Sequence, residues 1–151
     1  MGELSNQEPR SVVVSGPAKG FRTDVEVGGH HLVVDEPVAV GGADEGPTPY
    51  EMLLAGLGAC TAMTLRIYAD RRKWPLERAR ISLRHRKVHA QDCVDCDTKP
   101  ARMDVVDRII TLEGALTEEQ RAKLLEIAER CPVHQTLQGK IQVNTRFADA
   151  P

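Results

Sequence analysis

Aromatic side chains are scarce in this 151-residue sequence, in which Phe, Tyr and Trp together make up 3%. A hydrophobic core must therefore be built from Val, Leu, Ile, Ala and Met, which the hydrophobic content of 41% allows. A chain of this length suits one domain and can bury roughly two-thirds of its unfolded surface. We therefore expect a single domain over residues 1–151, with the polar residues 1–10 disordered.

The sequence also lacks a strong charge of either sign, a secretory signal and a long apolar run. A net charge of −2 does not favour binding to nucleic acid or to an anionic membrane. Residues 1–10 contain no apolar stretch of the kind found in signal peptides. The longest apolar stretch, Met52 to Leu65, is shorter than the about 20 residues of a membrane span. We expect a cytoplasmic protein without nucleic-acid or membrane partners.

Four cysteines are present. In the reducing cytoplasm structural disulfides rarely persist. The four thiols are therefore candidates for chemistry, for metal binding or for simple packing.

The pattern along the chain predicts an α+β fold. Two helices should begin with capping boxes at Thr48 and Thr117, and the first should run to about Arg72. Runs of strands separated by helices, without regular βαβ alternation, favour this fold class. Alternating apolar and polar positions and turn signals predict strands at 11–14, 21–27, 30–35, 80–88, 103–112 and 140–147.

The first of these helices has no charged residue in its first half after Glu51. A helix that is apolar on every side is normally buried on every side. Small residues such as Gly56, Gly58 and Ala59 also allow another backbone to approach closely. A chain this small offers too little surface to cover such a helix, so we expect a homodimer.

Two segments carry a family resemblance. The stretch Gly42 to Tyr68, GADEGPTPYEMLLAGLGACTAMTLRIY, and the later Cys131-Pro132-Val133-His134 resemble the OsmC/Ohr family of osmotically inducible and organic hydroperoxide resistance proteins. The shared features are a glycine loop, a proline-led helix start, an Ala-Cys among small helical residues and a late Cys-Pro. The resemblance implies an OsmC-like interlocked dimer, in which curved antiparallel sheets wrap around two central helices.

The resemblance also implies a thiol peroxidase of oxidative-stress defence that reduces organic hydroperoxides and peroxide. Hydroperoxide would oxidise Cys60 to a sulfenic acid, and Cys131 would condense with it to form a Cys60–Cys131 disulfide. An external dithiol, in Ohr-type members a lipoylated protein, would reopen that disulfide. No bound cofactor is implied.

Physical chemistry sets a condition on the role of Cys60. The thiolate is the nucleophile, yet desolvation inside an apolar helix raises a thiol pKa. A catalytic Cys60 therefore needs a cation from another element, and without one it is simply a packed cysteine. Cys131 should be the N-cap of a short helix from Pro132 to Gln138, where the helix N-terminus favours a thiolate. Alternatively, Cys131 only continues the apolar face of the helix before it.

The charges that would activate Cys60 depart from the family pattern. Ohr-type members use a carboxylate at the start of the cysteine helix, and Glu51 lies one residue later than alignment on Cys60 requires. Glu51 is also about 13.5 Å from Cys60 along the helix, so any contact must cross a dimer interface. Its alternative role is a helix cap.

The activating arginine is also displaced. Lys19 falls where Ohr-type members carry it, and Arg22 follows three residues later. A lysine cannot offer the planar fork of a guanidinium to a carboxylate or a peroxide. We expect Arg22, paired with the partner subunit's Glu51, or else Lys19, to lower the pKa of Cys60.

A second cysteine pair, Cys93 and Cys96, lies in a polar loop with His89 four residues upstream. This is half of a zinc site and needs another ligand, such as His85 or a second chain. Three neighbouring aspartates raise the thiol pKa and argue against a fast nucleophile. The pair is most simply structural or without a role, and metal or redox function is the alternative.

Two other functions thus stay open. One is a non-catalytic protein that holds a small apolar ligand near Cys60. The other is a metal-binding or redox-sensing protein centred on Cys93 and Cys96.

Overall fold

The computed structural model describes residues 10–89 and 102–148. It forms two compact units, Met1–Leu53 and Leu54–Pro151, which are described separately. The predicted disorder of residues 1–9 and the loop of Cys93 and Cys96 lie outside the described residues. The single domain expected from the sequence stays a prediction.

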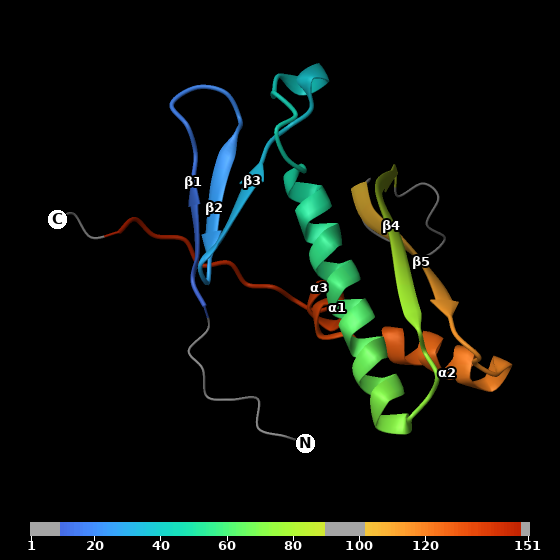
Figure 1. The fold of residues 1–151 in the computed structure, drawn as a ribbon. Helices are drawn as coiled ribbons and strands as arrows, with labels where there is room; N and C mark the ends of the chain where they lie inside the picture. Colours follow the sequence, from blue (N-terminus) through green and yellow to red (C-terminus); the bar gives the residue numbers. More distant parts are fainter. Residues whose placement is uncertain (1–9, 90–101, 149–151) are drawn as a thin grey trace. The chain divides into compact units, whose positions relative to one another are not determined.

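The first unit contains a three-stranded antiparallel sheet in the order β1-β2-β3 (Figure 1). Its strands are β1 (Val12–Ser15), β2 (Thr23–Val27) and β3 (His30–Val34). Gly28 and Gly29 join the last two strands with φ angles of 52° and 81°. Positive φ at both central residues is the geometry of a tight type I′ hairpin turn, which glycine adopts without strain. The predicted hairpin is therefore confirmed.

The glycine-rich loop follows β3 and is folded around a buried carboxylate. The Asp35 carboxylate accepts the backbone N–H of Glu36 at 2.8 Å and those of Ala43 and Glu45 at 3.1 Å each. The loop also contains a single 3-10 turn, η1 (Val38–Val40). These hydrogen bonds tie both ends of the loop to one side chain.

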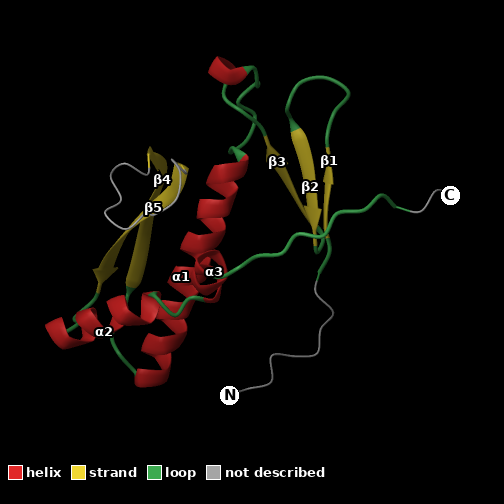
Figure 2. Ribbon diagram, turned by 180° about the vertical axis from the view of Figure 1, so that it is seen from behind, coloured by secondary structure: helices red, strands yellow, loops and turns green. Residues whose placement is uncertain are grey.

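The second unit contains most of α1 (Pro49–Arg72), a β-hairpin and two further helices (Figure 2). The hairpin consists of β4 (Arg78–His89) and β5 (Arg102–Glu113), and the helices are α2 (Glu118–Ala128) and α3 (Pro132–Gln138). The Thr117 capping box with Gln120 is present at the start of α2, as predicted. The hairpin register places Leu83 of β4 opposite Arg108 of β5.

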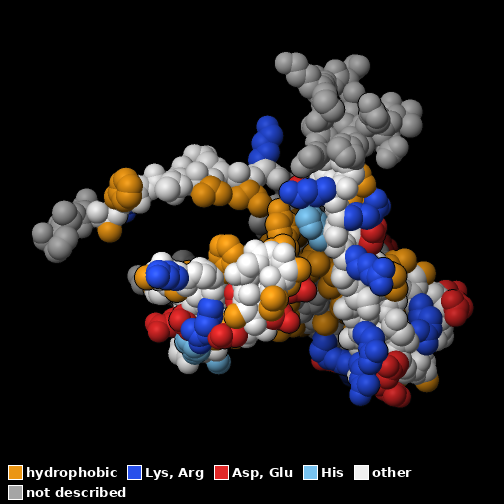
Figure 3. Space-filling view, turned by 90° about the horizontal axis from the view of Figure 1, so that it is seen from above, with side chains coloured by type: hydrophobic (Ala, Val, Ile, Leu, Met, Phe, Trp, Pro, Cys, Tyr) orange, Lys and Arg blue, Asp and Glu red, His pale blue; other side chains and the backbone are white. Residues whose placement is uncertain are grey.

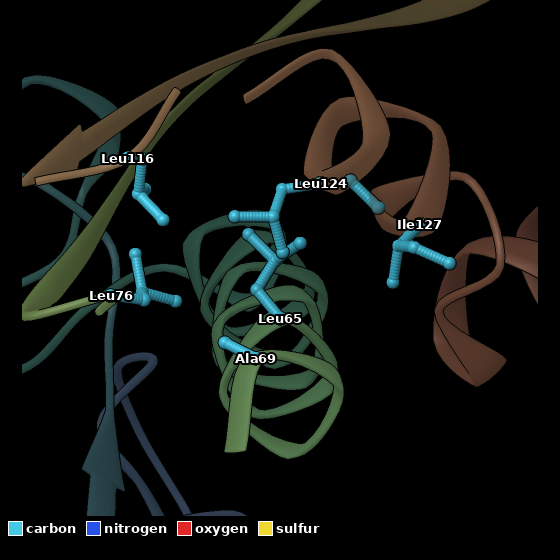
Figure 4. Close-up of a cluster of buried hydrophobic side chains, with 7 residues drawn as sticks. Leu65, Ala69, Leu76, Leu116, Leu124 and Ile127 are labelled. Atoms are coloured by element: carbon cyan, nitrogen blue, oxygen red, sulfur yellow. The ribbon is translucent and has the colours of Figure 1, made fainter. Parts of the chain in front are cut away.

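An aliphatic core holds the second unit together, as the shortage of aromatic residues required. Ile81, Ile110 and Leu112 of the hairpin pack against it. Figure 4 shows its main side chains, which come from α1, α2 and the segments between the elements. The core consists of Leu65, Ala69, Leu76, Leu116, Leu124, Ile127 and Ala128.

One stripe of α1 is buried, and the opposite side is open. The buried residues are spaced three or four apart, as expected for one helix face: Leu57, Gly58, Thr61, Leu65 and Ala69. Met63, 64% exposed, and Ile67 lie on the open side. Within one chain α1 is therefore not buried on every side.

The length of α1 also corrects a sequence expectation. By length and composition alone this 24-residue helix could cross a membrane, whereas the apolar stretch Met52 to Leu65 by itself is shorter than a membrane span. A helix that supplies the core of a globular protein meets the same criterion.

The strand predicted at residues 140–147 is wrong. Residues 140–148 have no regular secondary structure. Figure 3 shows hydrophobic side chains open along this extended segment, and Phe147 is 98% exposed. Alternation of apolar and polar residues predicts the two faces of a strand, but a strand also needs a neighbour for its backbone N–H and C=O groups. In the described part of the chain no strand pairs with this segment.

Candidate active site

Two cysteines that are far apart in the sequence meet in the second unit. Cys60 lies in the middle of α1 and is half-buried, whereas Cys131, just before α3, is fully buried. Both are free thiols, and a hydrogen bond joins their side chains. The structure therefore brings together the pair that the resemblance implied.

The turn between α2 and α3 places Cys131. Its N–H donates to the carbonyl oxygen of Ala128, and its own carbonyl accepts the N–H of Gln135 to open α3. Pro132 occupies the first turn, where its missing N–H costs nothing. The predicted helix Pro132–Gln138, with Cys131 as N-cap, is confirmed.

The two thiols are shifted in opposite directions. Burial raises the pKa of Cys60, and its hydrogen bond to Cys131 raises this pKa further. Burial also raises the pKa of Cys131, but hydrogen bonds from Cys60, from the His134 N–H, from Thr61 and from the Val133 N–H together bring this pKa below its ordinary value. The hydrogen bond between the thiols therefore favours the protonated form of Cys60 and the ionised form of Cys131. The directions agree with the expected effects of burial on Cys60 and of the α3 N-terminus on Cys131, and among the described residues no cation is one of the groups that shift the pKa of Cys60.

Two residues absent from the sequence predictions complete the surroundings of this pair. Thr61 follows Cys60 on α1, is fully buried and hydrogen-bonds Cys131. Arg108 of β5 donates through Nη1 to Thr61 Oγ1 at 3.0 Å, and only 9% of its side chain is exposed. The alternation of residues along β5 could have indicated that Arg108 is buried, because it lies on the same strand face as Ile110 and Leu112, which pack against the core.

Glu129 binds the side chains of both Arg108 and His134. One carboxylate oxygen accepts Arg108 Nη2 at 2.9 Å, and the other lies 3.2 Å from His134 Nε2. Its backbone carbonyl accepts Gln135 Nε2 at 2.6 Å, which fastens the α2–α3 turn. Arg108, Thr61, Glu129 and His134 therefore form one connected polar network beside the buried Cys131.

Comparison with known proteins decides the family. The sequence profile described as OsmC-like protein matches residues 42–146, which is more than half of the chain. The chain belongs to the OsmC/Ohr family. No curated protein matches the sequence.

Solved structures agree with this OsmC/Ohr membership. An OsmC-like protein from Mycoplasma pneumoniae has a TM-score of 0.69 and 16% identity over 87% of this chain and 89% of its own. An organic hydroperoxide resistance protein from Elizabethkingia anophelis has a TM-score of 0.64 and 19% identity over 92% and 94%. The organic hydroperoxide resistance protein OhrB of Bacillus subtilis has a TM-score of 0.59 and 16% identity over 85% and 91%. At these identities the likeness shows the α+β OsmC-like fold, and the interlocked dimer stays a prediction.

The basic residues predicted to activate Cys60 in this OsmC/Ohr protein belong to the first unit. Arg22 pairs through Nε with Glu45 at 2.6 Å and through Nη1 with Asp24 at 3.1 Å. It is 42% exposed, and Lys19 is also exposed. Arg22 is thus paired with Glu45 and Asp24, whereas the sequence predicted that it pairs with Glu51 of the partner subunit. The activating role of Arg22 or Lys19 stays a prediction.

Glu51 has a structural task within its own chain. Its carboxylate accepts the backbone N–H of Thr48 at 2.7 Å, and Thr48 Oγ1 accepts the N–H of Glu51 at 3.2 Å. This reciprocal pair is the predicted capping box of α1. A catalytic role for Glu51 would have to coexist with it.

The predicted metal ligands cannot be assembled from the described residues. Cys93, Cys96 and the side chain of His89 lie outside them. Across residues 10–89 and 102–148, no group of three or more His, Cys, Asp or Glu side chains is placed to hold a metal ion. The metal or redox role of Cys93 and Cys96 stays a prediction.

Proposed function

We propose that this protein is a two-cysteine thiol peroxidase that reduces organic hydroperoxides in peroxide defence. The observation that carries the proposal is the hydrogen bond between the Cys60 and Cys131 thiols within one chain. A resolving cysteine must reach the sulfenic acid that it condenses with, and this pair is already in contact. Membership of the OsmC/Ohr family, which includes hydroperoxide resistance proteins, supports a role in peroxide defence.

The proposed cycle has three steps. The Cys60 thiolate attacks the distal oxygen of the hydroperoxide, which yields Cys60 sulfenic acid and, after protonation, an alcohol. The Cys131 sulfur attacks Cys60, the S–OH bond breaks, a disulfide forms and water leaves. An external dithiol, of the lipoyl type, then reduces the disulfide and becomes a disulfide itself. No bound cofactor is needed.

Accessibility and ionisation favour different sulfurs for the first step. The pKa of Cys131 is lowered but its side chain is fully buried, whereas Cys60 is half-buried and can be approached. In the proposed step, transfer of the Cys60 proton to the Cys131 sulfur along their hydrogen bond generates the Cys60 thiolate when the substrate arrives. We therefore assign peroxide attack to Cys60 and resolution to Cys131, in a reducing cytoplasmic setting.

The test is consumption of cumene hydroperoxide and hydrogen peroxide with dihydrolipoamide as reductant. Cys60→Ser should abolish turnover, whereas Cys131→Ser should stop after one oxidation and leave a sulfenic acid that dimedone traps. The double variant Cys93→Ser/Cys96→Ser is the matched control and should retain turnover. Mass mapping that places the peroxide-induced disulfide at Cys93–Cys96 would show that the roles are assigned to the wrong pair.

One observation favours a second candidate, a protein that binds a small apolar ligand without turnover. The pKa of Cys60 is raised, mainly by burial, which disfavours the nucleophile. A folded wild type that consumes no peroxide, but whose Cys60 is protected from alkylation by an apolar ligand, would support this alternative.

We also propose that the active form is a homodimer. The open face of α1, which includes Leu53, Met63 and Ile67, is apolar and uncovered within one chain. An obligate interface buries about 2,000 Å² or more in total. Sedimentation should show a dimer at micromolar concentration, which Met63→Glu weakens and Leu125→Glu, a change on the exposed side of α2, does not. A stable wild-type monomer would contradict the proposal.

A further inference from the structure

Arg108 is a charged residue at a position where β5 presents core side chains. Ile110 and Leu112, two and four residues further along the strand, pack against the core on the same face. Burying a guanidinium is costly unless it is paired and its N–H groups are satisfied. Arg108 satisfies this condition with Glu129 at one nitrogen and Thr61 at the other. The ion pair with Glu129 by itself would balance the charge of Arg108, so it does not explain why Arg108 also donates to Thr61.

The Thr61 hydroxyl has one proton and two acceptors within reach. It donates to the carbonyl oxygen of Leu57 at 2.8 Å, and it also hydrogen-bonds the Cys131 sulfur. Arg108 cannot accept, so it occupies a lone pair of Thr61 Oγ1 as a donor. The hydroxyl proton is then free to turn from Leu57 to Cys131 when that sulfur becomes charged. Donation by a cation also makes a hydroxyl a stronger donor, because hydrogen bonds in a chain polarise one another.

We propose that Arg108, held by Glu129, is a positioning residue that acts on the Cys60/Cys131 pair through the Thr61 hydroxyl. It acts from within the same unit as the two thiols and through a hydroxyl, whereas the sequence suggested a direct positive neighbour at Arg22 or Lys19. The inference deepens the proposed peroxidase function, since a stabilised thiolate is what that chemistry requires. It concerns the ionisation of the pair, however, and can be tested without peroxide.

The groups facing the pair from each neighbouring element fit this role. Arg108 comes from β5, Glu129 from the end of α2 and His134 from α3, while the opposite strand β4 contributes the apolar Leu83 next to α1. Glu129 binds both basic side chains, so it neutralises part of the charge of Arg108 and fixes its direction. Arg108 therefore acts mainly by orienting a hydroxyl, not as a bare cation beside sulfur.

The experiment is a pH titration of thiolate absorbance in the Cys93→Ser/Cys96→Ser background, where only the site thiols titrate. Thr61→Val keeps the shape of the side chain and removes the hydroxyl, so the first midpoint should rise by about one pH unit and alkylation at neutral pH should slow about tenfold. Arg108→Gln should move the midpoint in the same direction. Thr61→Ser restores the hydroxyl and should restore the midpoint.

Two controls separate positioning from a structural role. Arg86→Gln removes an exposed arginine from the same hairpin, where it pairs with Asp107 at 2.9 Å, and should shift the midpoint by less than about 0.3 pH unit. Urea denaturation identifies any variant that is destabilised. If Arg108→Gln does not fold, Thr61→Val and its serine rescue still decide the point.

Peroxide assays on the same variants separate this inference from the proposed function. If the midpoints of folded Thr61→Val and Arg108→Gln stay within about 0.3 pH unit of wild type, the inference is overturned, whether or not wild type turns over peroxide. If the midpoints move as expected and wild type consumes no peroxide, the inference holds and the peroxidase proposal fails.

Discussion

Asp35 in the first unit and Cys131 in the second are both buried acids surrounded by hydrogen-bond donors. Hydrogen bonds from the backbone N–H groups of Glu36, Glu45 and Ala43 lower the pKa of Asp35. At Cys131, hydrogen bonds that include the backbone N–H groups of His134 and Val133 outweigh burial and lower its pKa as well. The same physical arrangement, a cradle of hydrogen-bond donors around a buried acidic side chain, therefore occurs twice in this chain.

The difference lies in the acid that is cradled. A carboxylate is ionised near neutrality without help, so at Asp35 the donors only fix the shape of a loop. A thiol is mostly protonated near neutrality, so at Cys131 the same kind of donors change how much nucleophile is present. A cradle of donors therefore fixes the local structure when it surrounds a carboxylate, and it changes the reactivity of the side chain when it surrounds a thiol.

The two cradles also differ in the apolar packing of the segments that carry them. Cys131 lies in the turn after α2, whose Leu124, Ile127 and Ala128 belong to the seven-residue aliphatic core. Among the described residues of the first unit, Val25 is the only buried apolar side chain. The thiol cradle should therefore depend on apolar packing and the carboxylate cradle on its own hydrogen bonds.

The largest expected effect tests the apolar support of the thiol cradle. Leu124→Ala removes a fully buried side chain of α2 and should lower the free energy of unfolding by about 2–5 kcal/mol. Leu125→Ala, at the next and exposed position, should change it by no more than about 0.5 kcal/mol. Urea denaturation measures both values. Equal effects would mean that the core does not support this turn.

The next effect tests the carboxylate cradle. Asp35→Asn leaves at least one backbone N–H of the loop unsatisfied, so amide hydrogen exchange at Glu36, Ala43 and Glu45 should accelerate by about tenfold or more. Asp44→Asn, an exposed carboxylate of the same loop with φ 56°, is the matched control and should leave these rates nearly unchanged.

The same cradle predicts a pH dependence. The pKa of Asp35 is lowered in the folded state, so its contribution is complete above its unfolded pKa and is lost as pH falls through the lower folded value. Protection of the loop amides should therefore decline in acid below about pH 4 in wild type, and this step should be absent in Asp35→Asn. A wild-type loop that is equally protected throughout this range would remove the carboxylate from the explanation.

The smallest effect separates the two roles of Glu51. The capping box of α2 uses Gln120 at the equivalent position, so Glu51→Gln should keep the cap of α1 and cost only about 0.3–1 kcal/mol from the helix dipole. Thr48→Ala, which breaks the cap, should cost about 0.5–2 kcal/mol. If Glu51 is only a cap, Glu51→Gln leaves peroxide turnover unchanged. A turnover loss at unchanged stability would instead support the charge relay that the resemblance implied.

Most elements of the fold were predictable because their signals are local. The glycine pair at Gly28 and Gly29 and the capping boxes at Thr48 and Thr117 fix a turn and two helix starts through contacts between near neighbours. The predicted strand at residues 140–147 failed because pairing is not local, and alternation does not say which strand is adjacent.

The sequence by itself thus determined the family, the two cysteines and the direction in which each helix context shifts its thiol. The tertiary structure alone brought Arg108 into a hydrogen bond with Thr61, the residue that follows Cys60 on α1. Arg22 and Arg108 are both arginines near apolar residues in the sequence, but one lies exposed beside Glu45 and the other is buried against Thr61. Burial and hydrogen-bond partners give a charge its effect on a distant residue, and both depend on how β5 packs against α1.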